Sequence, residues 1–144
     1  MILPDINVLI YAHREDSPEH AVYAEWLRRL VAGPEPFALS SHTLAGFLRI
    51  VTNRRIFKPP TPLSVALEFC HQLTAQPLAV LLQPGPRHWS LLCEIIEESA
   101  VEGALVSDAF LAALALEHGA QLVTTDVDFA RFPRLRWRHP LAPG

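Results

Sequence analysis

Residues 2–12 read ILPDINVLIYA, and the fold class follows from this stretch. Its first apolar run predicts a buried strand at Ile2–Asp5, and its second run has the three-residue spacing of a short helix at Asn7–Ala12. An acidic residue at the end of a strand, directly before a helix, stands where open α/β sheets place ligand chemistry. Asp5 is therefore the first candidate site residue.

The rest of the chain alternates between segments of strand and of helix periodicity. Strands are predicted at Phe37–Ser40, Ala79–Leu82, Gln121–Thr125 and, at one edge, Leu135–Trp137. Helices are predicted from Ser17 to about Val31, from Leu44 to Asn53, from Thr61-Pro62 to about Gln76, at His88–Ser99 and at Val106–His118, with a loop or single turn at Asp126–Phe132. This alternation predicts an α/β fold whose mostly parallel sheet of four to five strands has helices on both faces.

Capping residues mark three of these helix ends. Ser17 and Thr61 each precede a proline, which is the signature of an N-cap followed by the first helical position. Val106–His118 is almost wholly apolar, as a buried helix is, and Gly119 is well placed to end it.

The composition bounds the class of protein. A chain of 144 residues suits one domain, residues 1–144, and a hydrophobic content of 50% with 19% charged residues argues against disorder. No apolar run of about 18 residues predicts a membrane span, and Asp5 interrupts the N-terminal apolar stretch, which argues against a signal peptide. Cys70 and Cys93 have no metal-site spacing, so we expect two reduced core thiols in a cytoplasmic protein.

The basic residues are unevenly distributed. A net charge of −3 gives no general attraction for nucleic acid, but Lys58 is the sole lysine beside eleven arginines. They form two clusters, one with Arg54, Arg55 and Lys58, the other with Arg131, Arg134, Arg136 and Arg138. Arginine suits bidentate contacts with phosphate, so RNA binding and plain solvated loop charges are both open interpretations.

Four of the five aspartates stand at positions where they can meet. Asp5 and Asp126 each follow an apolar strand, and in a parallel sheet they would share the carboxyl edge. Asp108 begins the predicted buried helix, and Asp128 lies two residues past Asp126. Taken singly, Asp108 also fits an acid favoured by the helix dipole, and Asp126 and Asp128 fit turn chemistry.

Carboxylates that share a cleft repel one another, so either a pKa rises or a cation neutralises them. Ligands that are all oxygen suit hard ions such as Mg²⁺ or Mn²⁺. The chemistry that follows is hydrolysis of a phosphodiester bond with a metal-bound water as nucleophile.

Four segments, in this order, resemble a known family. They are Asp5–Ala12, Gly46–Asn53, Asp108–Ala115 and Thr124–Phe129. Together they resemble a PIN-domain ribonuclease, specifically a VapC-type toxin of a type II toxin–antitoxin pair.

The resemblance implies a PIN-like three-layer sandwich and an endoribonuclease that uses Mg²⁺ or Mn²⁺. It implies that Asp5 and Asp108 are the principal metal ligands, that Asp126 completes the acid cluster with Asp128 as an accessory, and that Asn7 supports Asp5 by hydrogen bonding. It also implies a cognate antitoxin that inhibits the enzyme, an RNA substrate and a homodimer. We expect Arg54, Arg55, Arg131 and Arg134 to contact the RNA backbone.

Two residues depart from the family's pattern. Many PIN domains have a glutamate three residues before the arginine of the third helix, where this chain has Gly46 before Arg49. Ile6 stands where threonine or serine is usual. The missing carboxylate puts tight binding of a second metal ion in doubt, and it motivates an alternative: a weak or inactive PIN scaffold that binds a partner protein or RNA.

A third interpretation starts from Asp5 alone. An aspartate after the first strand is also found in phosphatases of the haloacid dehalogenase type and in receiver domains. Both kinds of site normally use a lysine, and Lys58 lies in a proline-rich loop in mid-chain. The sequence therefore favours the nuclease.

Overall fold

A five-stranded sheet forms the centre of the computed structural model, which describes residues 1–143. The strands lie in the order β3-β2-β1-β4-β5, and each pairs in parallel with its neighbour. Their bounds are β1 Ile2–Pro4, β2 Phe37–Ser40, β3 Ala79–Leu82, β4 Gln121–Val123 and β5 Trp137–Arg138. The predicted α/β class with a parallel sheet is confirmed.

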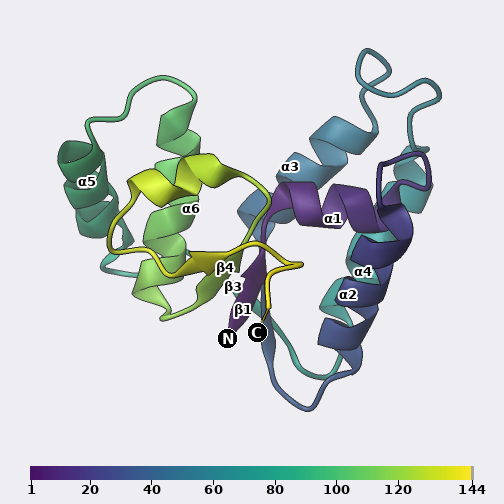
Figure 1. Ribbon diagram of the computed structural model, residues 1–144, viewed down its shortest axis with the longest axis horizontal. Helices are drawn as coiled ribbons and strands as arrows, with labels where there is room; N and C mark the ends of the chain where they lie inside the picture. The colour runs from purple at the N-terminus through teal and green to yellow at the C-terminus, as the bar shows by residue number, and fades with distance from the viewer. Residues whose placement is uncertain (144) are drawn as a thin grey trace.

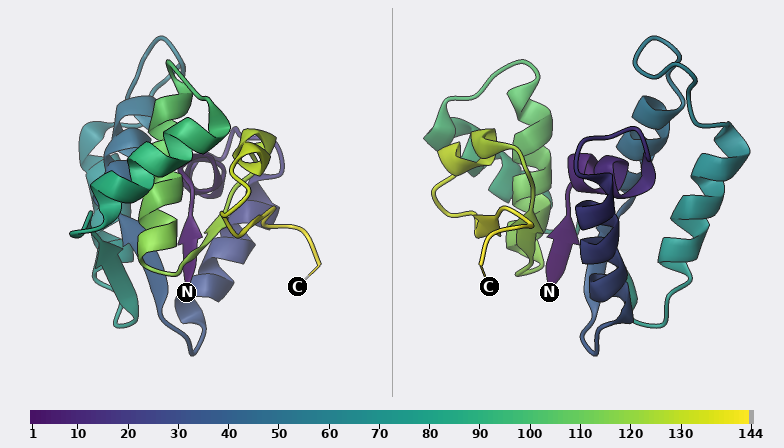
Figure 2. Two further views of the ribbon diagram at one scale, coloured as in Figure 1. Left: turned by 90° about the vertical axis from the view of Figure 1, so that its left-hand side faces the viewer. Right: turned by 45° about the vertical axis from the view of Figure 1, so that its right-hand side comes forward.

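Helices cover both faces of this sheet, which gives three layers (Figure 1). Helices α1 Ile6–His13, α2 His20–Ala32, α3 Ser41–Val51 and α4 Leu63–Thr74 lie on one side. Helices α5 His88–Ser99 and α6 Leu105–Glu117 lie on the other, together with the 3₁₀ helix η1 Val127–Arg131. The turned views in Figure 2 show the same separation of the two helical layers.

Strand β2 explains why two helical layers are needed. Its residues are all buried, and successive side chains of a strand point to opposite faces. Phe37 and Leu39 join the apolar cluster under α1–α4, whereas Ala38 joins the cluster under α5 and α6. A strand that is apolar at successive positions therefore requires cover on both sides.

Strand β1 lies at the centre of the sheet and carries the site. It is flanked by β2 and β4, with Pro4 opposite Val123. The next residue, Asp5, donates its N–H to Val123 O at 2.9 Å. The backbone of Asp5 is thereby fixed at the carboxyl end of the sheet.

Helix α6 ends as the sequence predicts. Gly119 has a φ of 65°, the left-handed conformation that favours glycine, directly after the C-cap His118. Ala120 N–H donates to Ala115 O at 2.9 Å and Gly119 N–H to Leu116 O at 3.3 Å. These two hydrogen bonds form a Schellman motif, which satisfies the last carbonyls of the helix.

The two predicted N-caps are wrong. Helix α2 begins at His20, three residues late, because Ser17 O accepts from His20 N–H in a preceding turn and Glu19 takes a φ of 57°. Helix α4 begins at Leu63 after Pro62, and no side chain caps it. Its end at Thr74 comes two residues before the predicted end at Gln76.

Cys70 is buried, Cys93 is half-buried, and both are free thiols. No helix within residues 1–143 is both long enough and apolar enough to cross a membrane.

Candidate active site

Asp5 occupies a buried position between β1 and α1. Its side chain is 6% exposed, and one carboxylate oxygen, Oδ1, accepts from the Ile6 N–H at 2.7 Å. Asp5 is thus the N-cap of α1, which supplies a backbone donor to the carboxylate. Burial raises its pKa and the charge of Asp126 raises it further, while hydrogen bonds from Thr124 and Ile6 act in the opposite direction.

Thr124 links the ends of β1 and β4. Its hydroxyl donates to Asp5 Oδ2 at 2.7 Å and accepts from the Asp126 N–H at 3.0 Å. The side chain is completely buried, so this geometry is closely held. Sequence reasoning did not single out Thr124, although a hydroxyl near the end of a predicted strand and two residues before an acid is a signal for such a link.

Asn7 acts one step further from Asp5 than the sequence predicts. Its Nδ2 donates to the Thr124 hydroxyl at 3.3 Å, and its Oδ1 accepts from the Thr125 N–H at 3.4 Å. The expected direct bond from Asn7 to Asp5 is therefore replaced by a bond through Thr124. The physical reason is that Asn7 lies on the first turn of α1, facing the chain that leaves β4.

Asp126 and Asp128 form a turn beside this network. Asp126 Oδ1 accepts from the Asp128 N–H at 2.8 Å and caps η1, so the expected turn chemistry is present as well. Asp128 is exposed and forms an ion pair with Arg131 at 3.3 Å. Although Asp126 caps this turn, its negative charge still raises the pKa of both Asp5 and Asp108.

Asp108 is brought to the same place from the other side of the sheet. It lies in the first turn of α6 and is half-buried. Burial, followed by the charges of Asp126, Asp5 and Asp128, raises its pKa to about 6, against which Arg131 acts. A first-turn acid that served only the helix dipole would favour its charged form. Burial and neighbouring carboxylates dominate here, so the charges of Asp126, Asp5 and Asp128 all act on Asp108.

The donor chemistry of this cluster fits a hard divalent cation. The candidate ligands are carboxylate oxygens, and the pKa of Asp108 is raised first by burial and then by repulsion from neighbouring carboxylates, which a cation would relieve. Within residues 1–143, however, no three His, Cys, Asp or Glu side chains are already grouped closely enough to hold a metal ion. Side chains would have to turn inward for several of them to share one ion.

The two departures from the family's pattern face each other. A Cβ placed on Gly46 would lie 2.5 Å from Ile6 Cδ1, closer than two carbon atoms can approach. The space beside Gly46 is thus occupied by the isoleucine that stands where threonine or serine is usual. The two departures are therefore linked: the δ-methyl group of Ile6 occupies the space that a side chain at Gly46 would need.

Several of the predicted RNA-binding arginines already have partners. Arg131 pairs with Asp128, and Arg134 contacts Glu94 at 2.9 Å and Glu98 at 3.2 Å. Arg54 and Arg55 are exposed in the loop after α3. Contacts of these residues with RNA stay a prediction.

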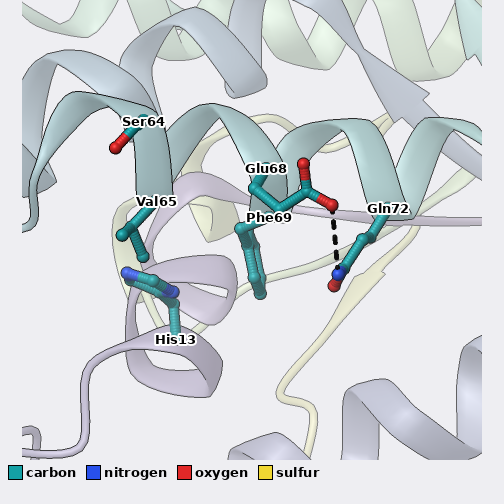
Figure 3. Close-up of a pocket in the computed structure, with 6 residues that line it drawn as sticks. All are labelled: His13, Ser64, Val65, Glu68, Phe69 and Gln72. Atoms are coloured by element: carbon teal, nitrogen blue, oxygen red, sulfur yellow. Dashed lines mark hydrogen bonds between the residues drawn. The ribbon is translucent and has the colours of Figure 1, made fainter.

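A separate hollow lies away from the acids, where the end of α1 meets α4 (Figure 3). Its volume is about 350 Å³, and Figure 3 shows His13 opposite side chains of α4. Glu68 accepts from Gln72 Nε2 there at 3.3 Å. No residue of the acid cluster lines this hollow.

Comparisons with known proteins show the family of this chain. The family model described as PIN domain matches residues 2–135. Ribonuclease VapC43 of Mycobacterium tuberculosis is 48% identical over 141 residues, which is 98% of this chain and 96% of the relative. The chain belongs to the VapC family of PIN-domain proteins. Ribonuclease VapC31 of the same species is 44% identical over 140 residues, 97% of this chain and 99% of the relative.

Solved structures that superpose on this VapC protein share its fold at low sequence identity. VapBC2 from Rickettsia felis, bound to a DNA fragment from its promoter, superposes with a TM-score of 0.70 at 19% identity, covering 96% of this chain and 98% of that chain. VapC20 from Mycobacterium tuberculosis, described as a toxin that cleaves the sarcin-ricin loop, gives a TM-score of 0.66 at 14% identity, covering 90% and 93%. The PIN-like three-layer sandwich is confirmed.

Proposed function

We propose that this VapC protein is an endoribonuclease and the toxin of a toxin–antitoxin pair, with Mg²⁺ or Mn²⁺ as its cofactor. The observation that carries the proposal is the convergence of Asp5, which is buried, with the half-buried Asp108 and Asp126, in which burial and the neighbouring carboxylates raise the pKa of Asp108 to about 6. The relatives that match over nearly the whole chain are named ribonucleases, which favours this function over an inactive scaffold.

The residues of the chain have distinct tasks in this proposal. Asp5 and Asp108 hold the cation, and Asp126 completes the cluster with Asp128 as an accessory. When bound, the cation would neutralise the carboxylates, polarise the phosphodiester and acidify water. Thr124 and the Ile6 N–H fix the orientation of the Asp5 carboxylate, and Asn7 in turn fixes Thr124. This preorganisation holds the Asp5 carboxylate in place to receive the cation.

The partners follow from the neighbours. Solved relatives are VapBC assemblies, so we propose a cognate antitoxin for this chain. A homodimer and an RNA substrate complete the proposal. Light scattering measures the homodimer, and co-purification with the product of a neighbouring gene tests the antitoxin.

Removing either principal acid should abolish cleavage. We expect Asp5→Asn and Asp108→Asn to lower the rate of cleavage of total bacterial RNA by at least roughly 100-fold, because loss of a metal ligand costs more than loss of a supporting residue. Sequencing of newly formed RNA ends with Mn²⁺ present measures this. Asp16→Asn is the matched control, because Asp16 is exposed and pairs with Arg14, outside the acid cluster.

Two results would contradict the proposal. Cleavage that persists in both variants would mean that the acid cluster is not the active site. Absence of cleavage by the unaltered chain at every Mn²⁺ concentration, with no binding of Mn²⁺ by calorimetry, would favour the scaffold. Induced expression in a bacterial host gives a second measure, because growth arrest should require Asp108.

A further inference from the structure

A second hollow borders the acid cluster. Its volume is about 320 Å³, close to the lower end of the usual size of small-ligand pockets, roughly 300–1,000 Å³. It lies between the first turns of α1 and α6 and the helix α3. It is lined by Ile6, His42, Ala45, Gly46, Arg49 and Ser107. Ile6 directly follows Asp5 and Ser107 directly precedes Asp108, so the hollow opens beside two of the acids.

The floor of this hollow is apolar because of Gly46. No side chain projects from this position, and the δ-methyl group of Ile6 fills the space that a Cβ would need. With no carboxylate among the six lining residues, the hollow has a different charge from the acid cluster beside it.

Arg49 supplies positive charge to the hollow. It is exposed, and its guanidinium takes part in none of the hydrogen bonds or ion pairs found within residues 1–143, unlike the paired Arg131 and Arg134. Gly46 lies one turn before it, so no carboxylate at that position competes for the guanidinium. Burial lowers the pKa of the His42 imidazole below its ordinary value, and the charges of Arg49 and His88 lower it further.

His42 and Ser107 form a fixed polar pair on the opposite wall. Ser107 Oγ lies 3.4 Å from His42 Nε2. The His42 ring packs on Phe110 with centroids 4.8 Å apart and an interplanar angle of 31°, and the Phe110 ring also contacts His88, with centroids 4.4 Å apart. The imidazole therefore has a defined orientation before any ligand binds.

We propose that this hollow binds the nucleotide next to the cleaved bond of the RNA substrate, with Arg49 on its phosphate and the Ser107–His42 pair on its ribose 2′-hydroxyl. The proposal rests on the ribonuclease function proposed above. An arginine matches the geometry of a phosphate, and a hydroxyl–imidazole pair can both donate to and accept from a hydroxyl group. The 2′-hydroxyl is the group by which a protein distinguishes RNA from DNA.

Binding can be measured without cleavage. The probe is a fluorescein-labelled ten-residue oligouridylate, titrated in EDTA and followed by anisotropy. We expect Arg49→Gln to weaken binding roughly tenfold and to reduce the salt slope by about 0.7, the contribution of one single-strand phosphate contact. Arg28→Gln removes the same charge from an exposed position on α2, where Arg28 pairs with Glu25, and should change neither quantity.

The polar pair has its own test. His42→Phe keeps a ring on Phe110 but removes both nitrogen atoms, and Ser107→Ala removes the hydroxyl. We expect each to reduce the preference for oligouridylate over the oligodeoxyuridylate of the same length by roughly three- to tenfold, while DNA binding changes little. Thermal unfolding of each variant verifies that the fold is retained.

NMR signals of the His42 ring show whether the oligouridylate binds in this hollow. These signals are assigned by their loss in His42→Phe. Oligouridylate should move them at concentrations at which inorganic phosphate alone does not. Signals that stay fixed, or that move equally with phosphate, would overturn the assignment to a nucleotide. Binding by Arg49→Gln that equals binding by Arg28→Gln would also overturn it.

These outcomes separate this inference from the proposed function. Cleavage by the unaltered chain, combined with no effect of Arg49→Gln, His42→Phe or Ser107→Ala, would remove the nucleotide site and leave the ribonuclease. Binding of RNA in the hollow without any cleavage would keep the site and remove the enzyme. Failure of both binding and cleavage would remove both.

Discussion

Asp108 shows how burial and charge combine at one residue. Its pKa is raised from 3.8 to about 6 in the folded chain, first by burial and then by three neighbouring carboxylates. An acid whose pKa is raised by folding binds more protons in the folded state. Its ionisation therefore lowers stability as the pH rises from about 4 to about 6, and the loss persists above that range.

Asp108→Asn should accordingly stabilise the metal-free protein at neutral pH. We expect its melting temperature in EDTA to exceed that of the unaltered chain at pH 7.5. The difference should shrink as the pH falls through 6 and vanish below 4, where both states of the unaltered chain are protonated. Differential scanning calorimetry across this range measures it. A difference that is the same at pH 4 and pH 7.5 would show that ionisation of Asp108 is not its cause.

At the residue scale the acids could be predicted and their connections could not. Aspartates at strand ends and at the start of a buried helix mark Asp5, Asp108 and Asp126, because topology alone brings these positions together. The bonds between them depend on side-chain directions. Periodicity does not encode those directions, so Thr124 was missed and Asn7 was assigned to Asp5 when its partner is Thr124.

Between elements, the contact of α1 with α3 is governed by Ile6 and Gly46. Glycine inside a helix costs up to about 1 kcal/mol relative to alanine. At position 46 glycine is nevertheless favoured, because the Cβ of any other residue would lie 2.5 Å from Ile6 Cδ1. The clashing atom is the end of a flexible side chain, so the helix can accept alanine only if that methyl group moves.

The two positions should therefore couple in a double-mutant cycle. Ile6→Val removes the δ-methyl group, and in that background Gly46→Ala should stabilise the protein by up to about 1 kcal/mol. In the unaltered background the same change should give little or no gain. Urea denaturation measures both. Ala45→Gly, at an exposed position of the same helix, should cost the same in either background, and equal effects of Gly46→Ala in the two would refute the coupling.

Helix ends show where local signals succeed. Gly119 ended α6 as predicted, since a left-handed residue with two backbone hydrogen bonds is a local motif. Ser17 and Thr61 failed because the chain makes turns of its own before α2 and α4, and tertiary contacts determine those turns. Thr61, for example, is buried and its hydroxyl lies 3.2 Å from His13 Nε2.

Across the whole molecule, the parallel sheet converts distant sequence positions into one site. Asp5 and Asp126 are separated by most of the chain, yet they follow the adjacent strands β1 and β4. Asp108 arrives from the opposite helical layer. The site therefore exists only when both apolar clusters and the sheet between them have formed, which ties its ligands to global folding.

Binding of a cation should consequently stabilise the entire fold. A ligand that binds only the folded state adds about 2.7 kcal/mol at a concentration one hundred times its dissociation constant, a rise in melting temperature on the order of 10 °C for a chain of this size. We expect Mn²⁺ to produce such a rise at pH 7.5 and a smaller one at pH 5, because a cation must displace the proton that Asp108 holds below about 6.

The matched variants determine whether this stabilisation comes from the acid cluster. Asp108→Asn and Asp5→Asn should lose most of the Mn²⁺-dependent rise, while Asp16→Asn should retain it, because Asp16 is exposed and outside the cluster. An equal rise in all four proteins would place the cation elsewhere. A rise that Asp108→Asn abolishes would show that the ion binds at the acid cluster, where its charge relieves the repulsion between the carboxylates of the metal-free fold.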